Sequence, residues 1–147
     1  MNSSNTKPRG YTVEKVKSIP TETFEMNPLD LKDIIEGLTD FNLKRAYWID
    51  SPKGKRKTGQ HAHKDENGIF IVLKGHANII LDDNGKGVKK VSVQRGHVIW
   101  IPKHVWHGVE TMSDDLVLMV LSDKNYDPSR KGYIESYEEF RNSVVKK

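Results

Sequence analysis

Between residues 60 and 121 the sequence repeats one pattern, in which a short apolar or alternating segment is followed by a break rich in Gly, Asn and Asp. The segments are too short for ordinary helices and are rich in β-branched residues, so they predict strands. The densest break, Asp82–Gly87, is typical of a turn. Many short strands at this spacing indicate a β-sandwich or a β-barrel, and we therefore predict an all-β fold. The predicted strands are Gln60–Lys64, Ile69–Lys74, His76–Leu81, Lys89–Val93, His97–Ile101, Gly108–Thr111 and Leu116–Leu121.

Further elements are expected on either side of this region. Phe41–Asp50 alternates as a strand does, which places Arg45, Tyr47 and Ile49 on one face. Apolar residues at helical spacing predict one or two short helices that flank the sheets. The other predicted elements are a strand at Tyr11–Ile19, a helix at Leu29–Leu38 and a C-terminal helix that includes Tyr133, Ile134, Tyr137 and Phe140.

The length of 147 residues fits one domain with a sizeable core. We expect a flexible tail at residues 1–10 and a single domain at residues 11–147. No apolar run approaches the roughly 18 residues of a membrane helix, and Met1–Ser4 lacks the apolar stretch of a signal peptide. We therefore expect a cytoplasmic protein with no membrane partner.

Composition excludes several kinds of site. The chain has no cysteine, which rules out disulfides, thiolate metal ligands and a cysteine nucleophile. The net charge is +4, but Lys and Arg are scattered among nearly as many Asp and Glu, and no basic helix is evident. We therefore expect no nucleic-acid partner, whereas a phosphorylated small molecule would suit the positive charge.

Two histidine motifs give the chain its candidate chemistry. His61 and His63 are two residues apart in a predicted strand, so both side chains point to the same face. About forty residues later, the stretch Gly96–His107 combines an apolar strand, a turn marked by Pro102 and a final histidine. An imidazole titrates near neutral pH, so such residues suit proton transfer and metal binding.

The order of these motifs, His-x-His followed by Gly-x5-Pro-x4-His, resembles the two motifs of the cupin β-barrel, a jelly roll. A narrower set of segments resembles the nucleotide-sugar 3,4-ketoisomerases, the WxcM-like cupins that act on dTDP-4-keto-6-deoxyglucose. The resemblance extends from about Phe41 to Phe140. The matching segments are Lys44–Ile49, His61–Lys64, Ile101–His107, Val117–Ser122, Tyr126–Asp127 and Tyr133–Phe140.

This resemblance implies an isomerase of a nucleotide-linked 4-keto-6-deoxyhexose that works without metal or cofactor. In the cupin barrel His61, His63 and His107 would converge, with His61 as the base and His63 as its partner or proton shuttle. Tyr47 and Arg45 match positions near the sugar. The resemblance also implies a homodimer and a role in surface polysaccharide biosynthesis. Further expected substrate contacts are Arg56 and Lys57, in a basic loop placed to contact a diphosphate, Lys64 beside the histidine pair, Trp106 at the pocket mouth and His107.

The sequence departs from the family pattern at two positions near the histidines. Thr58 replaces a usual arginine, and Asn67-Gly68 replaces a usual Glu-Gln. A non-catalytic sugar-binding or regulatory cupin therefore stays open as an alternative. A metal-dependent cupin enzyme that uses the three histidines is a second one, because neutral imidazoles bind Zn²⁺, Fe²⁺ or Ni²⁺. Metal-binding cupins usually supply a glutamate at the position of Gly68, and Glu66 comes two residues too early.

Overall fold

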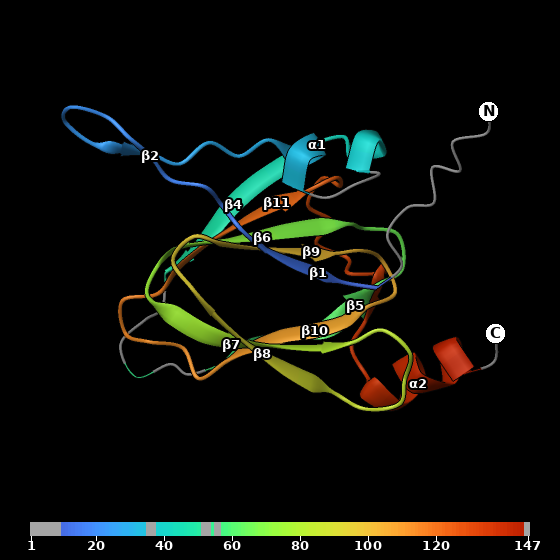
Figure 1. The fold of residues 1–147 in the computed structure, drawn as a ribbon. Coiled ribbons are helices and arrows are strands. Elements are labelled where there is room, and N and C mark those ends of the chain that lie inside the picture. Colours follow the sequence, from blue (N-terminus) through green and yellow to red (C-terminus); the bar gives the residue numbers. More distant parts are fainter. Residues whose placement is uncertain (1–9, 35–37, 51–53, 55–56, 146–147) are drawn as a thin grey trace.

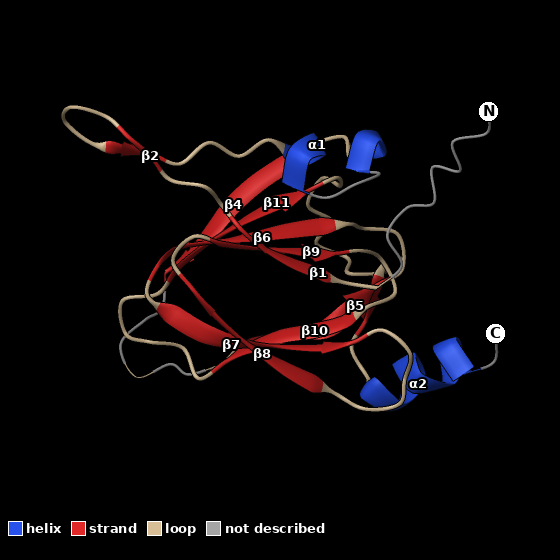
Figure 2. Ribbon diagram, viewed as in Figure 1, coloured by secondary structure: helices blue, strands red, loops and turns tan. Residues whose placement is uncertain are grey.

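Two five-stranded antiparallel sheets face each other in the computed structural model, which describes residues 10–34, 38–50, 54 and 57–145 (Figures 1 and 2). The first sheet has the order β1-β9-β6-β11-β4 and the second the order β12-β5-β10-β7-β8. The predicted all-β architecture is confirmed. The elements are β1 (Thr12–Lys15), β2 (Ile19–Pro20), β3 (Glu25–Met26), α1 (Leu31–Ile34), a 3-10 turn (Leu38–Asp40), β4 (Arg45–Asp50), β5 (Thr58–His63), β6 (Gly68–Lys74), β7 (His76–Asp82), β8 (Lys89–Gln94), β9 (His97–Ile101), β10 (Trp106–Glu110), β11 (Val117–Ser122), β12 (Tyr133–Ile134) and α2 (Tyr137–Val145).

The main core lies between the two sheets. Strand alternation turns Ile79 and Leu81 of β7 inward, and they pack in one buried cluster with Ile99 and Leu118 of the facing sheet. Full burial of such a side chain contributes about 1.5–3 kcal/mol to stability. The apolar cluster therefore holds the sheets together and gives rigid walls to any cavity between them.

The outer face of each sheet carries a helical cover. A second cluster, with Ile69, Ile71 and Trp100, packs under the segment of α1 and the 3-10 turn. On the other side α2 buries Phe140 against Trp106. Two flanking helical segments were predicted, and the structure has them on opposite sides of the molecule (Figure 2).

The predicted helix Leu29–Leu38 is shorter in the structure. Its α-helical part covers Leu31–Ile34, residues 35–37 lie outside the described residues, and Leu38–Asp40 forms a 3-10 turn. No helix in the described parts of the chain is long and apolar enough to cross a membrane.

The C-terminal prediction was wrong at its start. Tyr133 and Ile134 form strand β12, which pairs with His63 and Ala62 of β5, and α2 begins only at Tyr137. The backbone N–H of Glu139 donates to the hydroxyl of Ser136 at 3.3 Å, an N-cap that sets the helix start. Two predicted strands are also shorter in the structure: the first ends at Lys15 instead of Ile19, and the strand predicted at Phe41–Asp50 begins only at Arg45.

Candidate active site

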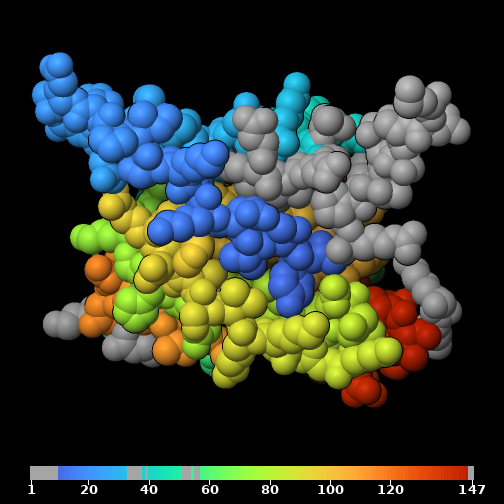
Figure 3. Space-filling model, in the orientation of Figure 1, coloured from blue at the N-terminus to red at the C-terminus, as the bar shows by residue number. Residues whose placement is uncertain are grey.

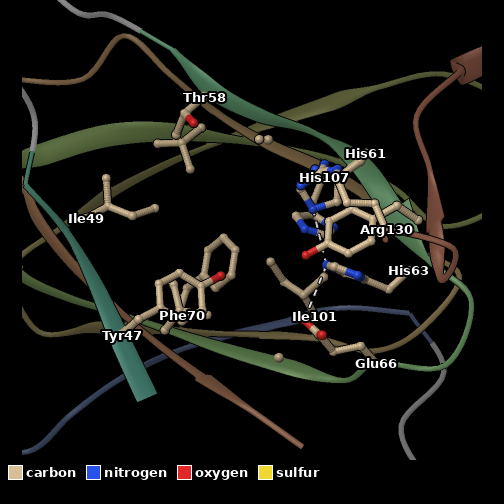
Figure 4. A pocket seen from close by; sticks show the side chains of 16 residues that line it. Tyr47, Ile49, Thr58, His61, His63, Glu66, Phe70, Ile101, His107 and Arg130 are labelled. Carbon is tan, nitrogen blue, oxygen red and sulfur yellow. Dashed lines mark hydrogen bonds and ion pairs between the residues drawn. The ribbon is translucent and has the colours of Figure 1, made fainter. Parts of the chain in front are cut away.

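A cavity of about 220 Å³ opens between the two sheets, next to the main core (Figure 4). Its apolar wall includes Ile49, Phe70 and Ile101, and its polar wall carries the histidines. Side chains from both sheets therefore meet in one concave space, which is the usual form of a small-molecule site.

The three histidines of the two motifs lie together in this cavity. His61 and His63 leave β5 on the same face, and His107 of β10 is the register partner of His61. The ring centre of His61 lies 4.7 Å from that of His63 and 4.8 Å from that of His107. The Nε2 atoms of His61 and His63 face each other at 3.2 Å. The structure thus brings together the histidines that the sequence singled out.

Burial keeps these imidazoles neutral. It lowers the pKa of His107 to about 4, of His61 to about 3 and of His63 to about 2, and the neighbouring His107 lowers the last two further. His107 Nδ1 lies 3.0 Å from the carbonyl oxygen of Val105, which can only accept, so the proton of this ring is on Nδ1. At neutral pH the cluster therefore offers lone pairs that can accept a proton.

A charged pair borders the histidines. Arg45 Nη2 lies 3.4 Å from Oε1 of Glu66, and the guanidinium carbon lies 5.0 Å from the ring centre of Tyr47. Burial raises the pKa of Glu66, and the positive charge of Arg45 opposes this shift. Partial burial raises the pKa of Tyr47 to about 12, so its hydroxyl stays protonated. Tyr47 lies across the cavity from the histidines, and it can donate a hydrogen bond to a bound oxygen (Figure 4).

Three cavity residues were missed from the sequence. Tyr133 packs against both motif histidines, with ring centres 4.8 Å from His61 and 4.5 Å from His63. The guanidinium carbon of Arg130 lies 4.0 Å from the ring centre of Tyr133. Glu66 was considered only as a metal ligand and set aside. The available signal for Glu66 was a carboxylate three residues after a histidine, next to a turn.

Other predicted contacts lie elsewhere. Trp106 does not line the cavity: adjacent strand residues point to opposite faces, so it packs against Tyr137 and Phe140 behind the sheet while His107 points inward. Lys64 is exposed, and its backbone N–H donates to Gly132. The predicted contact Arg56 lies outside the described residues, and Lys57 is exposed just before the cavity residue Thr58.

The same three histidines could hold a metal ion. Their ligand nitrogens all lie within 4.8 Å of one another, and neutral imidazoles are the usual protein ligands of Zn²⁺ and similar ions. Within the described residues, the group with this spacing contains no carboxylate. The donor set therefore fits a three-histidine centre.

Comparison with known proteins places this site in a family. The model of the family described as FdtA, WxcM-like, C-terminal, matches residues 14–145. A TDP-4-oxo-6-deoxy-α-D-glucose-3,4-oxoisomerase from Aneurinibacillus thermoaerophilus is 34% identical over 107 residues, which cover 72% of this chain and 75% of the relative.

Solved structures agree with this match. The TDP-fucose-3,4-ketoisomerase WlaRA of Campylobacter jejuni superposes with a TM-score of 0.76 at 30% identity, over 91% of this chain and 95% of the other. A 3,4-ketoisomerase from Helicobacter canadensis gives a TM-score of 0.77 at 28% identity, over 91% and 96% of the two chains. The family model covers most of the chain, and the paired sheets and histidine motifs agree with it. The chain belongs to the FdtA, WxcM-like C-terminal family.

Proposed function

We propose that this protein is a 3,4-ketoisomerase of a nucleotide-linked 4-keto-6-deoxyhexose. The observation that carries the proposal is the pair of neutral imidazoles, His61 and His63, in a cavity whose facing wall supplies the donor Tyr47. The names of the relatives, which act on TDP-linked sugars, support the same reaction class.

The reaction moves a ketone from C4 to C3 of the sugar. His61 removes the proton from C3, the electrons of that bond form the C3–C4 double bond of an enediol, and the C4 oxygen takes up a proton. The C3 hydroxyl then loses its proton to become the new ketone, and a proton is delivered to C4. Neutral imidazoles suit both transfers, and the donors Tyr47 and Arg45 would stabilise the developing oxyanion.

The nucleotide has to extend beyond the cavity, because the cavity is small. An adjoining hollow of about 320 Å³ shares His63, Glu66 and Tyr133 with the cavity and is an available place for it. The predicted substrate contacts Lys57 and Lys64 flank the two ends of β5. The six residues of β5 lie between them, and seven steps along an extended strand span about 23 Å, so at most one of them can contact the diphosphate.

The assembly that we propose is a homodimer. Within the described residues β4 pairs on one side only, and Trp48 on this edge strand is 64% exposed. The β2–β3 hairpin projects from the body with Phe24 also 64% exposed (Figures 1 and 3). A second copy that covers these apolar side chains would also cover the free strand edge. A cytoplasmic location is proposed from the sequence, and a pathway to surface polysaccharide is proposed from the family resemblance.

A metal-dependent reaction at the same histidines is the second candidate, and the spacing of the three ligand nitrogens is the observation that favours it. Elemental analysis of the purified protein and activity after chelation separate the two candidates. Stoichiometric metal together with loss of turnover on chelation would favour the metal enzyme. Full turnover in chelator would favour the metal-free isomerase.

The decisive experiment follows proton exchange at C3 by NMR in D₂O with dTDP-4-keto-6-deoxyglucose as substrate. Wild-type protein is expected to incorporate deuterium and to form a 3-keto species. His61→Asn should lower the rate by about 10²–10⁴-fold, the usual contribution of a general base. The matched control is His76→Asn, because the ring of His76 is exposed and outside the cavity. Saturable binding without exchange would refute the isomerase and favour a sugar-binding cupin.

A further inference from the structure

A buried carboxylate lies beside the histidine pair, and the reaction as described above does not use it. Glu66 is 8% exposed, and its Oε2 lies 3.5 Å from Nε2 of His63. Its two oxygens also lie 3.4 and 3.5 Å from Nη2 of Arg45. The Glu66 carboxylate therefore contacts both the guanidinium of Arg45 and the ring of His63, and Figure 4 shows Glu66 beside His63.

The turn after β5 holds Glu66 in this place. The side chain of the next residue, Asn67, donates to Asp123 at 2.8 Å and accepts from the backbone N–H of Lys103 at 2.9 Å. The backbone N–H of Asn67 also donates to Asp123 at 2.8 Å. These bonds tie residue 67 to two other loops, so Glu66 has little freedom to leave the cavity.

The two facing Nε2 atoms of His61 and His63 cannot both carry a proton at 3.2 Å. Without a third group, the two arrangements of this proton would be similar in energy. Glu66 removes that symmetry, because a carboxylate only accepts and it faces His63 alone. At 3.5 Å the contact is longer than an ordinary hydrogen bond, but the negative charge still favours a proton on the nitrogen that it faces.

We propose that Glu66 is a positioning residue that keeps the proton of His63 on Nε2 and thereby leaves Nε2 of His61 as the basic nitrogen of the site. The inference rests on the proposed function for its catalytic meaning. The arrangement of protons itself is a property of the free protein. Glu66 then decides which histidine is the base and which is the donor.

The test uses protein labelled with ¹⁵N in its histidines and treated with chelator, at neutral pH. Long-range ¹H–¹⁵N spectra report which ring nitrogen carries the proton. In the wild type His63 is expected to be protonated at Nε2 and His61 at Nδ1. Glu66→Gln should produce a mixture of both arrangements, because an amide can donate as well as accept. The control Glu138→Gln makes the same change at an exposed carboxylate on α2, outside the cavity and the adjoining hollow.

Turnover provides the second readout. We expect Glu66→Gln to lower kcat by about 10–100-fold, the range for loss of an orienting partner of a functional histidine, with little change in KM. Glu138→Gln should leave kcat unchanged. A wild-type spectrum with the proton of His63 on Nδ1 would overturn the proposal, and so would a loss of kcat in Glu66→Gln without a tautomer change. If the protein proves inactive, the proposed function fails, and the wild-type spectrum still decides the role of Glu66.

Discussion

Three buried neutral imidazoles should make this fold sensitive to mild acid. An unfolded chain binds a proton at each of these histidines below about pH 6.5. The folded state binds this proton only when the pH falls to the lowered pKa of each group. That pKa is about 4 for His107, about 3 for His61 and about 2 for His63. Because the unfolded state binds more protons in this window, the free energy of unfolding falls as the pH falls.

The size of the effect follows from these pKa values. Each histidine lowers the free energy of unfolding by about 1.4 kcal/mol for every pH unit below 6.5. At pH 5 this is about 2 kcal/mol for each, or about 6 kcal/mol for all three, compared with a total stability of about 5–15 kcal/mol for an ordinary domain. The contribution of His107 levels off near pH 4 at about 3 kcal/mol. Above pH 7 the three groups should no longer make stability depend on pH.

Urea unfolding of metal-free protein between about pH 7.5 and 5 measures this dependence. His107→Asn should reduce the slope by about 1.4 kcal/mol per pH unit, whatever its effect on stability at pH 7.5. His76→Asn, which changes an exposed ring, should leave the slope as in the wild type. A stability that is flat from pH 7.5 to 5 would show that the folded state accepts these protons, and the argument for neutral imidazoles would fail.

Two further changes test the packing around the site. Tyr137→Phe removes the 2.6 Å hydrogen bond to the buried carboxylate of Asp82, and we expect urea titration to show a loss of about 1–3 kcal/mol with unchanged turnover. Gly108→Ala adds a Cβ that would lie 2.7 Å from Nε2 of Gln60 and 3.1 Å from the backbone oxygen of Gly59. This substitution should lower the free energy of unfolding by about 1–3 kcal/mol. A melting temperature equal to that of the wild type would contradict the close approach of β10 and β5.

The strands were predictable because burial imposes a local pattern. The first half of β7 alternates, with Ala77 and Ile79 buried and His76 and Asn78 more exposed, and Asp82–Gly87 ends the strand with turn residues. The two-residue strand β12 has no such pattern, since its position depends on pairing with β5, which is distant in the sequence. The apolar spacing of Tyr133 and Tyr137 fits a helix equally well, and local propensity alone does not separate these cases.

The histidines of the site were predictable for a related reason. His61 and His63 share a face by strand geometry alone, and the second motif supplied His107. Glu66 and Tyr133 were not predictable. Glu66 lies in a turn and Tyr133 in a short strand, and tertiary contacts set the direction of both. The Asn67 bonds to Asp123 and Lys103 that fix this turn connect residues far apart in the chain.

Two small residues indicate where this chain differs from the family pattern. Thr58 and Gly68, which stand where the resemblance implies an arginine and a glutamine, both line the cavity. A Cβ on Gly68 would meet its nearest neighbour, the backbone oxygen of Leu121, at 3.7 Å, so the backbone leaves room for a side chain. The wall is therefore open where a long polar side chain would fit, whereas the histidines to which we assign proton transfer are kept. Thr58 begins β5 and Gly68 begins β6, and both differences leave His61 and His63 in place. We therefore expect divergence in the sugar that is bound, with the reaction at its carbons unchanged.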